Sequence, residues 1–175
     1  RRKTHKKVML SELPLNDLKQ QAWRREVAKF DFSVDLTEFS LSIDEIISIT
    51  NKEGIDARLI TNAAELLFGP FEGRDVRSKL LAEESILLVQ GLEQYFECVR
   101  RLVFSHFDFI PAWQLDDVMG SVNYNPASCG AHFDQYDVFL LQHTGEKKWY
   151  FDEEVHCDED LDENSEIRLL KNFSP

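Results

Sequence analysis

One stretch decides how this sequence is interpreted: AHFDQYDVFLLQ, residues 131–142. Its aromatic and β-branched residues predict a strand, and alternate side chains of a strand point to the same face. His132 and Asp134 would then share one face. An imidazole and a carboxylate in that arrangement supply two ligands of the 2-His-1-carboxylate facial triad, which holds Fe(II) and leaves positions open for a co-substrate and oxygen.

The neighbours of this pair favour a metal site over a chance pattern. His-x-Asp alone is a weak signal, because a strand histidine is often simply hydrogen-bonded. Gly130 precedes the pair and permits a close approach of the backbone. A polar run, residues 135–137, follows where a buried strand would stay apolar. The sequence therefore predicts a site here, with a structural histidine as the alternative.

Length and charge limit the possible classes of protein. The chain has 175 residues, of which 43% are hydrophobic, enough for one core and too few for two ordinary domains. It has no apolar run of about 20 residues, so we expect no membrane span. The net charge of −12 disfavours nonspecific nucleic-acid binding and would suit a basic partner. Solubility of a cytosolic protein is the other explanation of that charge.

The cysteines indicate a reducing compartment. Cys98, Cys129 and Cys157 are odd in number and lack Cys-x-x-Cys spacing, which favours free thiols over a disulfide scaffold or a zinc knuckle. We therefore expect a cytoplasmic protein, with the nucleus or an organelle as the alternative.

The first part of the chain predicts short helices followed by strands. Apolar residues recur at helical spacing over residues 16–29. Ser42 and Glu45 form a capping-box pattern at the start of a second helix, which Gly54 can end. Residues 57–61 and 65–68 have the composition of strands, and the Gly69-Pro70 pair predicts a turn after them.

The second part predicts mainly strands. Residues 86–90 form an apolar run typical of a strand covered on both faces, and residues 92–106 have helical spacing. Strands are then predicted by the four segments 118–124, 131–142, 147–152 and 166–171, with a hairpin at residues 143–145. Helices followed by closely spaced strands indicate an α+β chain whose second half is a β-sandwich or barrel.

Several motifs together resemble one family. The run from His132 to Gln142 and the segment Thr144-Gly145-x-Lys147-Lys148-Trp149 resemble the JmjC-type, cupin-fold ribosomal oxygenases, which use Fe(II) and 2-oxoglutarate. Supporting matches are Phe109-Ile110-Pro111-x-Trp113, Asp116-Asp117-Val118-Met119-x-Ser121 and Ile167-Arg168-Leu169-Leu170. The resemblance extends from about residue 86 to residue 173 and is loose before residue 55. The His-to-Gln run is its most specific part.

The resemblance implies a fold and a set of roles. An N-terminal region of helices and short strands, residues 1–85, would pack on a double-stranded β-helix of the cupin or jelly-roll type, residues 86–175, that is incomplete at its C-terminus. His132 and Asp134 would be catalytic and bind the iron. Lys147 would pair with the distal carboxylate of 2-oxoglutarate, although composition alone favours an exposed hairpin lysine.

The remaining roles concern the co-substrate pocket and the substrate. Ser121 and Asn123, on one face of a neighbouring strand, would line the 2-oxoglutarate pocket. Tyr136 and Asp117 are candidates for contacting a basic substrate side chain, with structural hydrogen bonds as the alternative for both.

The sequence departs from the family pattern in two places. The family's second iron-binding histidine follows the aspartate by more residues than this sequence has after Asp134, and neither His143 nor His156 matches its position. Asn125-Pro126-Ala127-Ser128-Cys129 stands where the family carries a glycine-rich loop, a difference that bears on substrate identity. We also expect the family's dimerisation helices and winged-helix region to lie outside this sequence, and we expect the full-length form to be a homodimer.

The prediction is a fragment of an Fe(II)- and 2-oxoglutarate-dependent protein hydroxylase. Its substrate would be an arginine or histidine of a basic ribosomal protein, with no membrane association and no direct binding of nucleic acid. One alternative is a non-catalytic cupin domain that binds proteins. Another is a zinc-dependent cupin hydrolase, which would not respond to 2-oxoglutarate.

Overall fold

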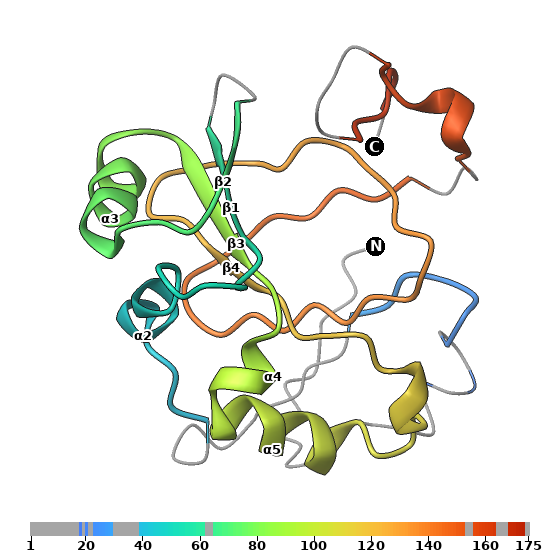
Figure 1. Cartoon of the computed structure of the whole chain (residues 1–175). Coiled ribbons are helices and arrows are strands. Elements are labelled where there is room, and N and C mark those ends of the chain that lie inside the picture. The colour runs from blue at the N-terminus through green and yellow to red at the C-terminus, as the bar shows by residue number, and fades with distance from the viewer. Residues whose placement is uncertain are drawn as a thin grey trace.

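The described part of the chain contains one antiparallel sheet. The computed structural model describes residues 18, 20, 23–29, 39–61, 65–152, 156–163 and 168–173. Its four strands have the order β2-β1-β3-β4, and each neighbouring pair is antiparallel (Figure 1). The strands are β1 (Ala57–Thr61), β2 (Leu66–Phe68), β3 (Ser85–Val89) and β4 (Gly120–Val122).

The predicted capping box is confirmed at the first described helix, α2 (Ile43–Ser48). The Ser42 hydroxyl accepts a hydrogen bond from the Glu45 amide at 3.2 Å, and the Glu45 carboxylate accepts one from the Ser42 amide at 2.8 Å. These bonds satisfy two donors that the first turn of a helix leaves open. The helix ends at Ser48, and Gly54 closes the turn that follows it, with a φ of +81°.

The central strands form where the sequence predicts them. β1 matches the predicted range, β2 begins one residue later, and β3 begins and ends one residue earlier. β1 pairs with β3 over five residues. Because β1 and β2 precede residue 86 whereas β3 spans it and β4 follows it, the two predicted regions of the chain share one sheet.

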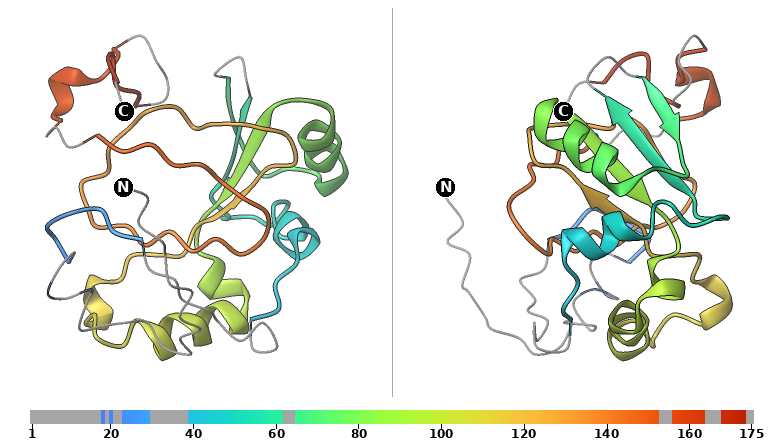
Figure 2. Two further views of the ribbon diagram at one scale, coloured as in Figure 1. Left: turned by 180° about the vertical axis from the view of Figure 1, so that it is seen from behind. Right: turned by 60° about the vertical axis from the view of Figure 1, so that its left-hand side comes forward.

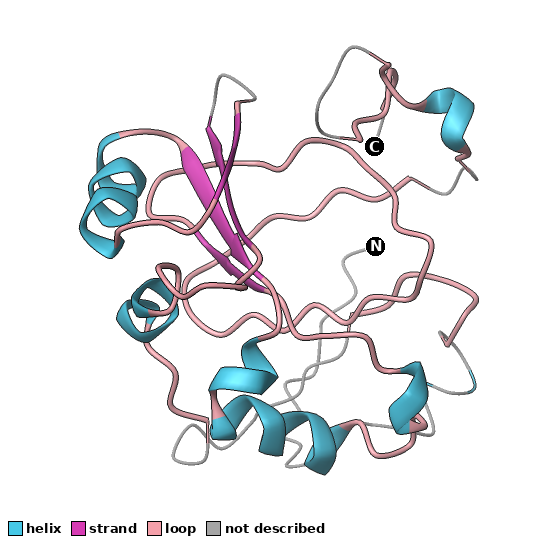
Figure 3. Cartoon of the chain, in the orientation of Figure 1, coloured by secondary structure: helices cyan, strands magenta, loops and turns pink. Residues whose placement is uncertain are grey.

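Helices cover one face of this sheet. α3 (Gly73–Ala82) was not predicted from the sequence, although Val76 and Leu80, one helical turn apart, are its buried residues. The predicted helix over residues 92–106 forms as two helices, α4 (Leu92–Tyr95) and α5 (Glu97–His106). They are separated at Phe96, whose φ of −122° and ψ of 115° are extended (Figure 3).

The core lies between the helices and one face of the sheet. Leu59, Leu87, Val89 and Val122 alternate with the other residues of their strands and face the helices, where each is at most 5% exposed. Strand alternation sends Arg58, Leu88 and Ser121 to the opposite face. Figures 1 and 2 show the helices on one side of the sheet and long loops extending from the other.

Residues 123–152 correct the prediction of a β-rich second half. The predicted strands at 131–142 and 147–152 are irregular chain, and the strand predicted at 118–124 is shortened to β4. A strand needs a hydrogen-bonded neighbour, and the described residues pair this segment through one backbone bond only, from the Leu170 amide to the Ala131 carbonyl at 2.8 Å. The architecture is α+β, and a double-stranded β-helix does not close within the described residues.

The ends of the chain differ from the prediction as well. Five residues of the helix predicted at 16–29 (16, 17, 19, 21 and 22) lie outside the described residues, and residues 23–29 form a turn and irregular chain. Arg24 has a φ of +57°, which ends a right-handed helix, and Trp23 stacks on Phe139 with ring centroids 5.5 Å apart.

The strand predicted at 166–171 is described from residue 168 onward, where it is reduced to an isolated bridge between Leu161 and Leu170. Two short 3₁₀ helices, η2 (Ala112–Gln114) and η3 (Asp158–Asp160), complete the described elements. No helix in the described ranges is both long and apolar enough to cross a membrane.

Candidate functional site

Two predicted co-substrate residues meet beside the outer face of the sheet. The strand register places Arg58, Leu88 and Ser121 in one row across β1, β3 and β4. The Lys147 ammonium, 26 residues further along the chain, donates a hydrogen bond to the Ser121 hydroxyl at 2.7 Å. The hydroxyl thus comes from β4, and the cation comes from the irregular segment of residues 123–152 that follows it.

Lys147 is half-buried, and its burial shifts its pKa. Burial lowers the pKa of Lys147, and the nearby Cys129 thiol opposes that shift. Burial also raises the pKa of Cys129, with Lys147 acting in the opposite direction. A partly desolvated ammonium gains from an anionic partner, so this location suits a carboxylate ligand.

Asn123 is directed elsewhere. Its side-chain amide donates to the Asn125 carbonyl at 2.7 Å, just beyond the end of β4. The Asn125 side chain in turn donates to carbonyls at the end of α3, of Leu80 at 3.3 Å and of Glu83 at 3.2 Å. The structure therefore uses Asn123 to hold a turn that Asn125 fastens to α3. Sequence reasoning missed Asn125, which it treated only as part of a divergent loop.

His132 is exposed, and its ring is oriented by the backbone. Its Nδ1 lies 2.9 Å from the Gly130 carbonyl oxygen. Because a carbonyl only accepts, Nδ1 is the donor and Nε2 can bind a metal, which is the usual arrangement of a metal-binding histidine. The close approach expected at Gly130 is present: a Cβ there would lie 2.5 Å from the Leu169 side chain, and the φ of Gly130 is +81°.

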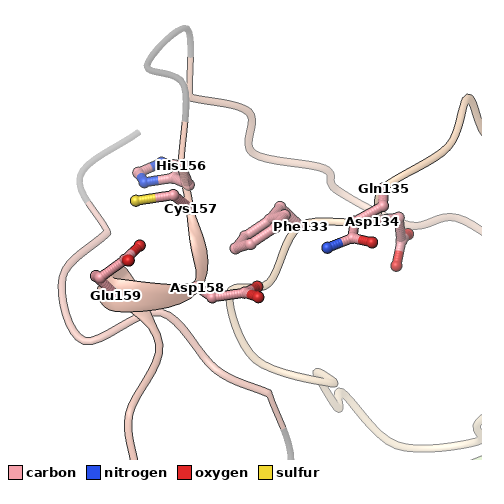
Figure 4. A pocket seen from close by; sticks show the side chains of 7 residues that line it. All are labelled: Phe133, Asp134, Gln135, His156, Cys157, Asp158 and Glu159. Atoms are coloured by element: carbon pink, nitrogen blue, oxygen red, sulfur yellow. The ribbon is translucent and has the colours of Figure 1, made fainter.

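Asp134 lines an open hollow rather than a formed metal site. The hollow has a volume of about 460 Å³ and is lined by Phe133, Asp134, Gln135, His156, Cys157, Asp158 and Glu159. In Figure 4 the Phe133 ring lies between Asp134 on one side and His156 with Cys157 on the other. The His156 ring stacks on Phe133, with centroids 6.5 Å apart.

The His156 ring is engaged by other carboxylates. Its Nε2 lies 3.2 Å from an oxygen of Asp152, and its Nδ1 lies 3.7 Å from an oxygen of Asp160. Within the described residues, no group of three His, Cys, Asp or Glu side chains is arranged to hold a metal ion. The donor chemistry of His132 and Asp134 suits Fe(II), and these two donors fit a three-ligand site in part.

The two predicted substrate residues are neighbours in an acidic environment. Burial raises the pKa of Tyr136 most, and the charges of Asp134, Asp116 and Asp117 raise it further. Burial also raises the pKa of Asp117, although a hydrogen bond from the Gly91 amide at 3.1 Å opposes the shift. Tyr136 thus lies near Asp134 and Asp117, where a cationic group would be stabilised.

One cation faces this acidic group from the sheet. Arg58 lowers the pKa of Tyr136, against the three aspartates. Its guanidinium is held by Asp56, with Nε to Oδ1 at 2.9 Å and Nη2 to Oδ2 at 2.5 Å. Arg58 is therefore already paired, and its charge is largely compensated.

The chain matches one family in the comparison with known protein families. Residues 102–175 match the JmjC domain. This range includes all seven candidate residues named from the sequence: Asp117, Ser121, Asn123, His132, Asp134, Tyr136 and Lys147.

Two curated proteins are similar over most of this chain. A "Probable ribosomal oxygenase" from Haemophilus influenzae is 33% identical over 133 residues, which is 74% of this chain and 32% of that protein. A "Ribosomal protein uL16 3-hydroxylase" from Escherichia coli is 32% identical over 124 residues, or 67% of this chain and 32% of that protein. The chain thus spans about a third of the length of these relatives.

Solved structures of YcfD, a ribosomal oxygenase from Escherichia coli, share the fold. One superposes with a TM-score of 0.58 at 26% identity and covers 71% of this chain and 33% of that chain. Another, in complex with cobalt and succinic acid, has a TM-score of 0.56 at 28% identity, over 71% of this chain and 34% of that chain.

Proposed function

Since the chain belongs to the JmjC-type ribosomal oxygenase family, we propose that it carries part of the active centre of an Fe(II)- and 2-oxoglutarate-dependent protein hydroxylase. The observation that carries this proposal is the 2.7 Å hydrogen bond from Lys147 to Ser121. A half-buried ammonium beside a hydroxyl is suited to pairing with a carboxylate, and 2-oxoglutarate has a distal carboxylate to offer.

His132 and Asp134 would hold the iron in this proposal. The hydrogen bond from His132 to Gly130 leaves Nε2 available as a ligand, and Asp134 supplies an exposed carboxylate oxygen. When bound, Fe(II) together with 2-oxoglutarate supplies the oxidising chemistry that hydroxylates a carbon–hydrogen bond. The protein residues bind and orient: Lys147 and Ser121 fix the co-substrate, and Asn123 holds the adjoining turn.

The fold and assembly of a longer form are part of the same proposal. The family's second iron-binding histidine has no counterpart in His143 or His156, so a longer form would supply it. Strands of that form would pair with residues 131–152 and complete the double-stranded β-helix, on a core of residues 86–175 with 1–85 as the N-terminal region. We also propose a homodimer in the cytoplasm that does not bind nucleic acid directly.

The substrate would be an arginine or histidine side chain of a ribosomal protein. Tyr136 and Asp117 lie near Asp116 and Asp134, and this acidic group suits a cation. One relative is named for the hydroxylation of ribosomal protein uL16, which supports a basic ribosomal substrate here.

The test is an anaerobic titration with Fe(II) and then with 2-oxoglutarate, followed by the visible charge-transfer band of the chelate. We expect a band in the wild-type chain, none in His132→Ala, and a band in Lys147→Ala only at higher 2-oxoglutarate concentration. Lys148→Ala is the matched control, because Lys148 is exposed and lies over the Tyr150 ring, 4.7 Å from its centroid. It should titrate like the wild type.

A non-catalytic protein-binding domain remains the second candidate. The observation that favours it is the absence of a three-ligand metal cluster among the residues that the structure describes. A wild-type chain that gives no band would contradict the hydroxylase proposal for this chain and support the binding domain. A zinc-dependent hydrolase would bind metal through His132 and Asp134, and 2-oxoglutarate would leave that binding unchanged.

A further inference from the structure

Glu93 accepts a hydrogen bond from the backbone next to Asp117, the candidate substrate residue. We propose that Glu93 is a positioning residue that fixes the Asp117 carboxylate for a cationic substrate side chain, an inference that rests on the substrate site proposed above. Glu93 lies in α4 and contacts the backbone next to Asp117 rather than the Asp117 side chain.

Three hydrogen bonds connect the start of α4 to residues 117 and 118. The Gly91 amide donates to Asp117 Oδ2 at 3.1 Å, and the Leu92 amide donates to the Val118 carbonyl at 3.0 Å. In return, the Val118 amide donates to Glu93 Oε2 at 2.9 Å. Each segment donates to the other, so these bonds fix the position of residues 117 and 118 relative to the start of α4.

The segment that carries Asp117 has few other constraints. It is irregular chain between η2 and β4, and the Asp117 side chain is exposed. Within the described residues, its carboxylate accepts a hydrogen bond at Oδ2, so Oδ1 can accept one from a cationic ligand. Loss of the Glu93 contact would free the Val118 amide and loosen the backbone that aims this carboxylate.

Gly91 makes the arrangement possible. Its φ of +72° is in the left-handed region that favours glycine. Gly91 is buried, so its amide needs an acceptor, and the Asp117 carboxylate provides one. The orientation of Asp117 is thus tied to the turn between β3 and α4, next to Glu93 in the first turn of α4.

The charge of Glu93 and its hydrogen bond to the Val118 amide can be separated by substitution. Glu93 is one of the carboxylates that raise the pKa of Asp117. Glutamine keeps an oxygen that can accept from the Val118 amide and removes the charge, whereas alanine removes both. Positioning therefore predicts that Glu93→Gln behaves like the wild type and that Glu93→Ala does not.

The experiment measures binding of N-acetyl-arginine amide to the whole chain by NMR titration. Asp117→Asn, which removes the charge, should weaken binding at least about tenfold, the range for a hydrogen bond to a charged group. Glu93→Ala should weaken it comparably, and Glu93→Gln should remain within about twofold of the wild type. The neutral analogue N-acetyl-norleucine amide should bind none of the variants measurably.

Each contrary outcome has a distinct meaning. Unchanged binding in Asp117→Asn would overturn the proposed substrate contact itself. Sensitivity of Asp117→Asn with wild-type binding in Glu93→Ala would overturn the role of Glu93 and leave the contact standing. Equal weakening in Glu93→Gln and Glu93→Ala would assign Glu93 a direct charge effect instead. If Glu93→Ala does not fold, Glu93→Asp replaces it in the test. Its side chain is one methylene shorter, so binding should weaken to an intermediate extent. Wild-type binding in Glu93→Asp would overturn the proposal.

Discussion

The sheet and the loop that follows it, residues 123–152, both contain apolar residues and differ in how far those residues are buried. In the sheet, Leu87 and Val89 are completely buried, whereas in the loop Leu140 is 51% exposed and Trp149 is 49% exposed. The sheet strands are paired along their length, and the loop has one backbone hydrogen bond to another described segment at Ala131. Of these two regions, the paired strands bury apolar residues in the core, and the loop leaves many of its apolar residues exposed.

The candidate site lies at the junction of these two regions. Ser121 belongs to the last strand, and Lys147 comes from the loop. Tyr136, in the loop, lies near Arg58 of β1 and near Asp117, which α4 holds. The sheet and the start of α4 thus supply polar groups next to residues 123–152, the segment that carries the proposed iron ligands.

The largest effect expected from this difference is on stability. Leu87→Ala removes a fully buried side chain and should lower the free energy of unfolding by about 3 kcal/mol. Leu140→Ala, in the loop, should change it by less than about 0.5 kcal/mol. Urea denaturation of both variants measures this, and equal losses would mean that the loop is packed in solution.

Loss of the hydrogen bonds between Asn125 and the end of α3 should have the next largest effect on stability. Asn125→Ala removes a donor that serves carbonyls at the end of α3 and should cost about 1 kcal/mol. Asn125→Asp also places a negative charge at a helix C-terminus and should cost about 2 kcal/mol. Urea denaturation checks the order of the two variants, and a fully stable Asn125→Asp would exclude this contact as a constraint on the loop.

The pH dependence of co-substrate binding tests Lys147 at the junction. Burial lowers the pKa of Lys147, so its ammonium form is lost at a lower pH than that of an ordinary lysine. The affinity for 2-oxoglutarate should therefore fall several-fold between about pH 7 and pH 10, as measured by calorimetry. Lys147→Arg keeps its charge throughout and should show a flatter profile. A constant wild-type affinity would argue against a charge contact.

An effect as small as that of Asn125→Ala is expected at the start of α2, one of the helices that cover the sheet. Ser42→Ala removes the cap and should cost about 1 kcal/mol. Hydrogen bonds from Ser42 lower the pKa of Glu45, so the contribution of Glu45 is present above the ordinary carboxyl pKa and is lost as the pH falls through the lowered one. The stability difference between wild type and Glu45→Gln should therefore shrink in acid, and a difference independent of pH would contradict this origin.

The sequence-based predictions were accurate for the central strands and the start of α2 and less accurate for the loop and the N-terminal residues. The capping box at Ser42 and the strands β1 and β3 depend on residues close in sequence and were predicted within one residue. The strand at 131–142 was predicted from its composition alone, and it is wrong because the described chain supplies no neighbouring strand. The helix at 16–29 is wrong at its described end, where Trp23 stacks on Phe139.

The sequence alone was enough to identify the family and the chemical character of the candidate residues. Side-chain type is local information, so the imidazole of His132, the carboxylate of Asp134 and the ammonium of Lys147 could be named with their possible roles before any fold was known. Only the tertiary structure decided that Lys147 reaches Ser121, that Asn123 does not, and that Glu93 supports the backbone beside Asp117. Those contacts join segments 25 or more residues apart in two of the three cases, and the packing of the sheet and loop selects them.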